Sequence, residues 1–303
     1  MMETEATSRR YSGLDAWEPS EILDALIEGQ LAAVAAVRAV RADLEQAALA
    51  IEERLRRGNG RLIYAGAGTS GRLAVLDGAE LPPTFSWPPE RLVLLIAGGD
   101  EALVQSVEGA EDEGEDGATL IRRHEVGPAD VLVAVAASGT TPFTLACLCE
   151  AKARQALTVG IASNARTPLL TEADHGIWLD TGPEAIAGST RMKAGTAQKI
   201  TLNLLSSLVM IRLGRVFDGL MVDVQATNAK LVRRSENMLM HLTDRSRAEV
   251  RDALKRADGS VKLAVLLLQG CDVPTAEAAL SRADGQLRTA LELLSERDAT
   301  NAR

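Results

Sequence analysis

The stretch Gly66-Ala67-Gly68-Thr69-Ser70-Gly71-Arg72 decides the fold, because it follows the apolar run Leu62–Ala65 and opens a helical segment. Glycines allow the backbone to turn sharply and to come close to an anion. The N-terminus of a helix adds unpaired N–H groups and a partial positive charge. The stretch therefore predicts a strand, a phosphate-binding loop and a helix, with Gly68, Thr69 and Ser70 as ligands of the phosphate.

Four further apolar runs are short and continuous rather than alternating, which is typical of strands buried on both faces. They are residues 92–97, 131–136, 157–162 and 177–179. Helical segments separate most of the runs, at Gly71–Leu81, Glu101–Glu111 and Thr141–Gln155. This alternation predicts an α/β fold with a doubly wound five-stranded parallel sheet, in which ligands bind at the carboxyl ends of the strands.

Helical sequence flanks the α/β region on both sides. Glu21–Arg57 has apolar residues at three- and four-residue spacing, which predicts one long helix. Glycines between short helical stretches near the C-terminus predict a compact three-helix module. We therefore expect four segments: an N-terminal helical segment at 1–57, a ligand-binding α/β domain at 58–216, a helical connection at 217–245 and the three-helix module at 246–303.

Composition limits the partners. Of 303 residues, 46% are hydrophobic, and 33 Lys+Arg stand against 42 Asp+Glu for a net charge of −9. These values exclude disorder over the whole length and argue against nucleic acid or a membrane surface as a partner. The apolar runs are far shorter than the eighteen or so residues that span a bilayer. Three cysteines, and no signal-like segment at the start, favour the reducing cytoplasm.

A second hydroxyl-rich loop, Ser138-Gly139-Thr140-Thr141, follows the third apolar run and precedes a helix. One such loop alone is explained by ordinary helix capping. Two loops at one sheet edge favour anion binding, and Ser138, Gly139, Thr140 and Thr141 become candidate ligands. The first loop also matches G-x-G-x-x-G, with Asp100 as a ribose-binding acid, so a dinucleotide site stays open. The hydroxyls of Thr69 and Ser70 suit a terminal phosphate monoester better.

Two acids are candidates for proton transfer. Glu80 lies at the end of the helix that the first loop opens, with Asp77 one turn earlier. The negative end of the helix dipole and the neighbouring carboxylate both favour the protonated form that a general acid needs. Glu111 is expected to close the next helix, within an acidic run that otherwise reads as a solvated face. On sequence alone, a catalytic role for either residue stays undecided.

A third polar constellation, Gly182–Thr196, follows the last predicted strand. Ser189, Thr190 and Arg191 in it suit a carboxylate or a second phosphate contact. The alternative is that Ser189 or Thr190 caps the helix that follows. Neither a zinc-like Cys/His cluster nor a nucleophile–His–acid set is present in the sequence, so we expect no metal.

These motifs make the chain similar to the N-acetylmuramic acid 6-phosphate etherases, members of the sugar isomerase (SIS) superfamily related to glucokinase regulatory proteins. The similarity rests on the first loop, Asp77–Thr84, Val107–Asp112, Gly182–Thr196 and Gly219–Val224, and it spans nearly the whole chain. It implies a SIS domain at 58–216 and cleavage of the lactyl ether of N-acetylmuramic acid 6-phosphate, giving N-acetylglucosamine 6-phosphate and D-lactate in peptidoglycan recycling.

The resemblance also implies roles. Glu80 corresponds to the family's acid, and Glu111 to its second active-site glutamate, which would take the C2 proton of the open-chain sugar. No metal or redox cofactor would be needed, and the enzyme would be a cytoplasmic homodimer. The chain departs from the family pattern at three positions. Arginine is common in the family at the position of Thr140, cysteine at that of Leu81 and alanine at that of Gly78. Two alternative functions stay open: a sugar-phosphate sensor that binds its ligand without turnover, and an aldose–ketose isomerase.

Overall fold

The computed structural model describes residues 2–224 and 229–301, with the side chains of 230 and 297–301 left aside. The chain forms two compact units. The first comprises Met1–Glu80 and Pro89–Val209, and the second comprises Leu81–Pro88 and Met210–Arg303. These units divide the chain differently from the four predicted segments: the N-terminal helices belong to the unit that contains the sheet, and the connection after residue 216 belongs to the C-terminal unit.

The first unit is built on a five-stranded sheet with the order β2-β1-β3-β4-β5, in which every pairing is parallel. The strands are β1 Leu62–Gly66, β2 Leu92–Ile96, β3 Val131–Val135, β4 Leu157–Ala162 and β5 His175–Trp178. Strands β1, β3 and β4 are buried along their whole length. The predicted doubly wound parallel sheet is therefore confirmed.

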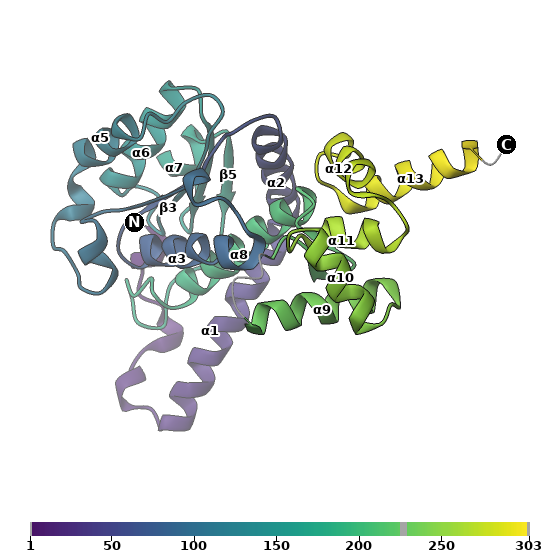
Figure 1. The fold of residues 1–303 in the computed structure, drawn as a ribbon. Coiled ribbons are helices and arrows are strands. Elements are labelled where there is room, and N and C mark those ends of the chain that lie inside the picture. The colour runs from purple at the N-terminus through teal and green to yellow at the C-terminus, as the bar shows by residue number, and fades with distance from the viewer. Residues whose placement is uncertain (1, 225–228, 302–303) are drawn as a thin grey trace. The chain divides into compact units, whose positions relative to one another are not determined.

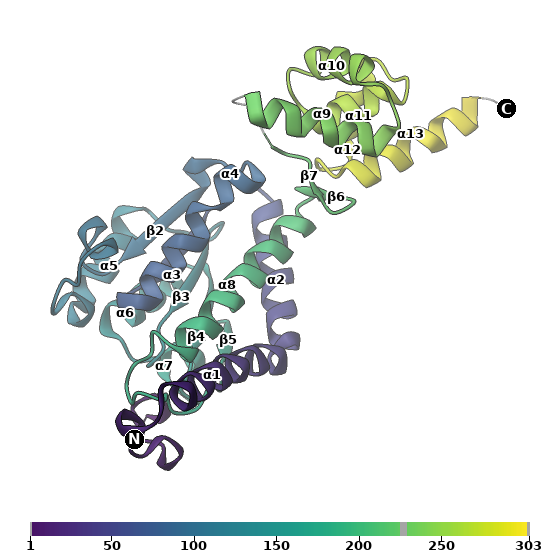
Figure 2. The ribbon, with the colours of Figure 1, turned by 90° about the horizontal axis from the view of Figure 1, so that it is seen from below.

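Helices cover both faces of the sheet (Figure 1). Helices α5, α6 and α7 pack on one face, around an apolar cluster that includes Ile63, Ile121 and Phe143. Helices α2, α3 and α8 lie on the other face (Figure 2). The helices are α1 Pro19–Ala39, α2 Arg41–Arg56, α3 Gly68–Ala79, α5 Gly114–Arg123, α6 Pro142–Ala153, α7 Pro168–Glu172 and α8 Lys193–Arg212.

The N-terminal helix is interrupted, and here the prediction of one continuous helix is wrong. Helix α1 ends at Ala39 and α2 starts at Arg41, because Val40 leaves the helical conformation with φ −95° and ψ 20°. The apolar spacing continues through the break, so periodicity alone did not reveal it. Figure 2 shows α1 and α2 running in different directions, and α2 packs against β3, β4 and β5.

The predicted helix at Glu101–Glu111 is also wrong. This segment forms two short 3-10 turns, Asp100–Leu103 and Ala110–Asp112, with a loop between them. Gly99 and Gly109 precede the two turns with positive φ values of 67° and 76°. Residues in this conformation cannot continue a right-handed helix. Glu111 therefore lies in a loop between β2 and α5 rather than at a helix end.

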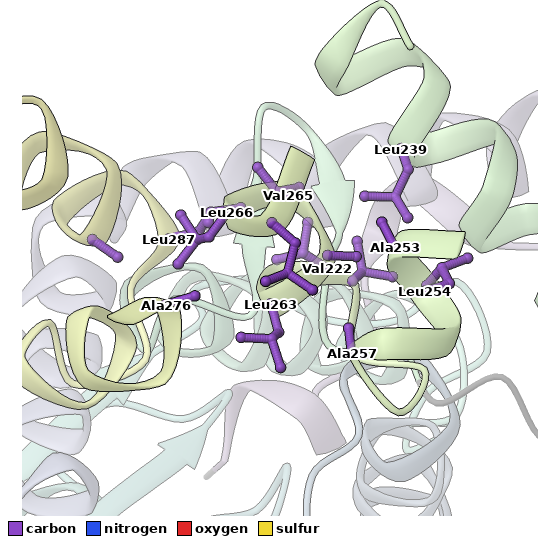
Figure 3. Packing of buried hydrophobic residues seen from close by; sticks show 14 of the residues in the cluster. Val222, Leu239, Ala253, Leu254, Ala257, Leu263, Val265, Leu266, Ala276 and Leu287 are labelled. Carbon is purple, nitrogen blue, oxygen red and sulfur yellow. The ribbon is translucent and has the colours of Figure 1, made fainter. Parts of the chain in front are cut away.

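The second unit is helical, apart from a two-stranded antiparallel ribbon of β6 Val216–Phe217 and β7 Leu220–Met221. Within the residues that the structure describes, four helices follow α9, where the sequence predicted three. The helices of this unit are α4 Leu81–Phe85, α9 Ala229–Thr243, α10 Arg247–Arg256, α11 Val261–Leu268, α12 Val273–Arg282 and α13 Leu287–Asn301. Figure 3 shows part of the apolar core of this unit, to which Leu239 of α9 and Leu263 and Leu266 of α11 belong.

The segment Gly219–Val224 contributes Asp223 to a partly buried ion-pair cluster of the second unit. Asp223 lies 2.8 Å from the Nζ of Lys262, which is 7% exposed, and 3.2 Å from Arg215. Arg215 also donates to the carbonyl oxygens of Phe85 and Ser86. These contacts fix the residues that follow Glu80 into the second unit. In the described residues, none of the helices combines the length and the apolarity that crossing a bilayer requires.

Candidate active site

The first loop lies at the carboxyl end of β1, as predicted. Gly68 starts α3 with a φ of 52°, and the N–H of Gly71 donates to the carbonyl oxygen of Ala67. A Cβ on Gly71 would lie 2.7 Å from the carbonyl oxygen of Gly66, so this position needs glycine. The close packing directs the first turn of α3 towards the sheet edge, where its N–H groups are available to an anion.

The second loop lies next to the first, because β3 is the neighbour of β1. Adjacent strands are about 4.8 Å apart, so the two loops share one edge of the sheet. The Oγ of Ser138 lies 3.1 Å from Oγ1 of Thr141 and accepts the N–H of Thr140 at 3.2 Å. Gly139 adopts a φ of 71° and makes the turn. The structure thus brings together the two loops that the sequence predicted as anion sites.

Glu111 and the first loop share a cavity of about 310 Å³. Gly68 and Arg72 line one side of it, and residues 106–111 line another. Glu111 is exposed, so its carboxylate is accessible to a ligand in the cavity. The residues of the second loop do not line this cavity but lie beside it along the sheet edge.

Arg72 positions the loop that carries Glu111, and the sequence reasoning missed this function. Its Nε donates to the carbonyl oxygen of Ala102 at 2.8 Å, and its Nη2 donates to that of Gln105 at 3.0 Å. Both carbonyl groups belong to the loop between β2 and α5. The guanidinium therefore ties the first turns of α3 to the segment that leads to Glu111. The available signal was the position of Arg72 inside the first motif.

The Gly182–Thr196 constellation adjoins the first loop at the N-terminus of α8. A Cβ on Gly195 would lie 3.5 Å from Cγ2 of Thr69, which places the two segments in contact. The buried carboxylate of Glu184 accepts the N–H groups of Lys193 and Ala194 at 3.2 and 2.9 Å. Burial raises the pKa of Glu184, and the two backbone N–H groups oppose that rise.

Glu184 therefore caps α8, and the alternative that Ser189 or Thr190 is the cap is wrong. Ser189 and Thr190 are half-buried and Arg191 is exposed in the turn before the helix. Their backbone N–H groups are partly used inside this turn, since Ser189 donates to Ile186 and Thr190 to Gly188. Their side chains stay candidates for contacting a ligand at this edge.

Glu80 lies at the other end of α3. The helix has 12 residues, so at roughly 1.5 Å per residue Glu80 is about 18 Å from Gly68. It is exposed, whereas Asp77 is 6% exposed and accepts hydrogen bonds from Tyr64, Asn203 and Ser206. The two acids predicted to act together, Glu80 and Glu111, are therefore not brought together within one chain.

The comparisons with known proteins agree with this architecture. A family model of the SIS domain matches residues 103–208, and one of the glucokinase regulatory protein N-terminal SIS domain matches residues 44–152. A solved phosphoheptose isomerase from Francisella tularensis has the same fold, with a TM-score of 0.50 and 20% identity over 65% of this chain and 98% of that one. Fold and sheet-edge loops thus define a SIS-domain protein.

Two relatives give the particular family. An N-acetylmuramic acid 6-phosphate etherase of Deinococcus radiodurans is 52% identical over 266 residues, which cover 88% of this chain and 87% of the relative. The etherase of Streptomyces avermitilis is 48% identical over 279 residues, which cover 91% of this chain and 88% of that relative. The chain belongs to the N-acetylmuramic acid 6-phosphate etherase family, which confirms the resemblance predicted from the motifs.

Proposed function

We propose that this protein cleaves the D-lactyl ether of N-acetylmuramic acid 6-phosphate, giving N-acetylglucosamine 6-phosphate and D-lactate. One observation carries the proposal: the N-terminus of α3, a site for a phosphate, and the carboxylate of Glu111 border the same cavity. A phosphate held at Gly68, Thr69 and Ser70 leaves the sugar carbons to extend along the cavity towards Glu111. The names of the relatives support the choice of substrate.

The reaction is an elimination followed by addition of water. In the open-chain sugar, the aldehyde at C1 acidifies the proton on C2, and Glu111 removes that proton as general base. The electron pair forms the C2–C3 double bond, the C3–O bond breaks, and Glu80 gives its proton to the departing lactate oxygen. Water then adds to C3 of the unsaturated aldehyde, and a proton returns to C2. The sum is redox-neutral, so the chemistry needs no redox cofactor.

The remaining sheet-edge residues have binding roles in this proposal. Ser138, Gly139, Thr140 and Thr141 complete the phosphate site beside the first loop. Thr140 offers a hydroxyl and a backbone N–H rather than the guanidinium that is common in the family. Arg191 and the hydroxyls of Ser189 and Thr190 face the other anion, the lactyl carboxylate, for which an arginine is well suited.

About 18 Å separates the two ends of α3, so Glu80 cannot reach a substrate bound at the phosphate loop of its own chain and must act on one bound by another chain. We infer a homodimer in which each chain supplies Glu80 to the site of the other. Exposed apolar side chains support such an assembly: Leu76, one turn before Glu80, is 55% exposed, and Leu204 on the neighbouring α8 is 50% exposed. Burying them against a second copy would be favourable.

Helix α1 offers a further surface for the second copy. Leu23, Ile27, Leu31 and Val34 recur at helical spacing and are each more than half exposed. A continuous apolar stripe of this kind is typical of a helix that packs against a partner. We place the enzyme in the cytoplasm, where its three cysteines, which form no disulfide in the structure, would stay reduced.

The decisive experiment is incubation with N-acetylmuramic acid 6-phosphate in water enriched in oxygen-18, followed by mass analysis of both products. Elimination and rehydration put the label into the sugar and leave the lactate unlabelled. Labelled lactate would mean direct hydrolysis at the lactyl carbon and would overturn the mechanism. Binding without release of lactate would overturn the activity in favour of a sugar-phosphate sensor.

A further inference from the structure

A hydrogen bond joins the phosphate loop to helix α8, which begins within the Gly182–Thr196 signature. The hydroxyl of Ser70, in the first turn of α3, lies 2.9 Å from Oε1 of Gln198 on α8. Both residues are buried, with Gln198 fully enclosed and Ser70 8% exposed. Gln198 lies two residues beyond the Gly182–Thr196 signature, and no motif argument assigned it a role. It is nevertheless the side chain that orients the Ser70 hydroxyl.

The direction of this bond matters for anion binding. A hydroxyl carries one proton. While Ser70 donates that proton to the amide oxygen of Gln198, it presents only lone pairs to a phosphate, whose oxygens are also acceptors. The Nε2 of Gln198, meanwhile, is buried and has no hydrogen-bond partner within the described part of the chain. An unsatisfied buried donor costs on the order of 1–3 kcal/mol.

Turning the Gln198 amide about its terminal bond gives Nε2 a partner and frees the Ser70 proton, while Oε1 gives up its hydrogen bond from Ser70. The amide oxygen and nitrogen occupy nearly equivalent positions, so Nε2 then donates to Oγ of Ser70 over the same 2.9 Å. The Ser70 proton becomes available to a phosphate oxygen. A chain of two hydrogen bonds, from the amide to the hydroxyl and from the hydroxyl to the anion, polarises each member and strengthens both bonds.

We propose that Gln198 is a positioning residue for phosphate: its amide turns when a phosphate monoester binds and so converts Ser70 from a donor to Gln198 into a donor to the ligand. The identity of that monoester as the 6-phosphate of an amino sugar rests on the proposed function. The donor requirement itself holds for any phosphate monoester in this loop. Gln198 acts through Ser70 and does not touch the reacting atoms.

The test is a double-mutant cycle on Gln198→Met and Ser70→Ala, with binding of N-acetylglucosamine 6-phosphate measured by calorimetry and unphosphorylated N-acetylglucosamine as the ligand control. Methionine keeps the length of the side chain but cannot hydrogen-bond strongly. We expect Ser70→Ala to weaken binding by about tenfold or more, the value of one hydrogen bond to a charged group. Gln198→Met should weaken it about three- to tenfold, because its hydrogen bond to the Ser70 hydroxyl joins two neutral groups. In the Ser70→Ala background, Gln198→Met should have no further effect, because its only route to the phosphate is gone.

Gln198→Glu adds a second measurement, the pH dependence of binding, which a purely structural role of Gln198 would leave unchanged. The carboxylate is an acceptor only, so it holds the Ser70 proton and adds negative charge near the phosphate. Binding should fall further than in Gln198→Met at pH 8 and recover in part as the pH is lowered, because burial at this enclosed position raises the pKa of a carboxyl group and its protonated form again donates. In turnover assays, KM should rise with little change in kcat, since the phosphate is held equally in ground and transition states.

Gln30→Met is the matched control, because Gln30 accepts a hydrogen bond from Thr196 of the same helix α8 and is therefore joined to that helix rather than to Ser70. Its binding constant should equal that of the parent. Unchanged binding by Gln198→Met, or an equal loss in the presence and absence of the Ser70 hydroxyl, would overturn the proposal. Lactate release by the parent protein is scored separately, so a failure of the proposed activity is distinguishable from a failure of this inference.

Discussion

The phenol of Tyr64 donates a 2.9 Å hydrogen bond to Oδ2 of Asp77, linking the centre of β1 to the last turn of α3. Burial, followed by the negative charge of Asp77, raises the pKa of Tyr64 well above its ordinary value, so the phenol remains a donor. Oδ1 of Asp77 accepts from Asn203 and Ser206 on α8. One buried carboxylate thus holds the sheet, α3 and α8 together, beneath the end of α3 that presents Glu80.

Removing this carboxylate should be strongly destabilising. Asp77→Ala leaves the buried hydroxyls of Tyr64 and Ser206 and the half-buried amide of Asn203 without this acceptor, and we expect a loss of about 2–4 kcal/mol in the free energy of unfolding. Tyr64→Phe removes one donor and leaves the carboxylate with two, so about 1 kcal/mol is expected. Urea denaturation of both variants measures the difference. An Asp77→Ala protein as stable as the parent would show that the cluster does not hold α3 in place.

Arg72 should matter for turnover more than for folding. In Arg72→Met the carbonyl groups of Ala102 and Gln105 lose their donor, and the loop that carries Glu111 is no longer held. A displacement of about 1 Å in a catalytic group can cost roughly a hundredfold in rate, so we expect kcat to fall by about 10- to 100-fold. Steady-state release of lactate measures the change.

Arg123→Met is the control for Arg72→Met. Arg123 is exposed on α5 and lies away from the cavity that contains Glu111. This variant removes the same charge and should keep the parent kcat. If the two variants lose activity equally, net charge rather than the clamp on the loop explains the effect.

The sheet could be predicted from the sequence because the strands are continuous apolar runs. The predicted and observed bounds of β1 and β4 agree within a residue. The break at Val40 was not predictable in this way, since no glycine or proline marks it and the apolar spacing continues. There the packing of α2 on the sheet, a long-range contact, overrides the local pattern.

The candidate site was predictable where one local motif suffices, as for Gly68 at the end of β1. The loop between β2 and α5 was not, because its conformation depends on hydrogen bonds from Arg72, some 30 residues earlier in the chain. Gln198 was missed for the same reason: its partner Ser70 lies 128 residues away. The separation of Glu80 from Glu111 follows from the direction of α3, which a motif does not encode.

The ion pair of Arg61 and Asp130, at the amino ends of β1 and β3, should make the stability of the protein depend on pH. Asp130 accepts hydrogen bonds from the guanidinium of Arg61, the shortest at 2.7 Å. Burial alone would raise the pKa of Asp130, but the hydrogen bonds from Arg61 and Gly127 outweigh it and lower the pKa below its ordinary value. A lowered pKa in the folded state means that this stabilisation is present above the unfolded pKa of about 3.9 and is lost as the pH falls through the folded value.

Arg61→Met should therefore cost about 1–3 kcal/mol at pH 7, the range for a hydrogen bond to a charged group. The gap between variant and parent should close in strongly acidic solution, where Asp130 is protonated in both proteins. Urea unfolding at a series of pH values from 7 downwards measures it. A gap that is constant over the series would show that Arg61 stabilises by packing alone.

The most discriminating prediction concerns the two separated acids. If each site combines Glu111 of one chain with Glu80 of another, Glu80→Ala and Glu111→Ala are each inactive as pure proteins but complement each other when mixed. A mixed dimer has one site with both acids and one site with neither. Random pairing makes half of the dimers mixed, so an equimolar co-expressed sample should recover about a quarter of the parent activity.

Differently tagged chains allow the mixed dimer to be purified, and its activity should approach half that of the parent per dimer. Circular dichroism and binding of N-acetylglucosamine 6-phosphate by the pure variants establish that each is folded and retains the phosphate site. If both acids served the same site from a single chain, every site in the mixed dimer would lack one of them. The mixture would then stay as inactive as its components, and Glu80 would have to reach Glu111 by a rearrangement of α3 within one chain.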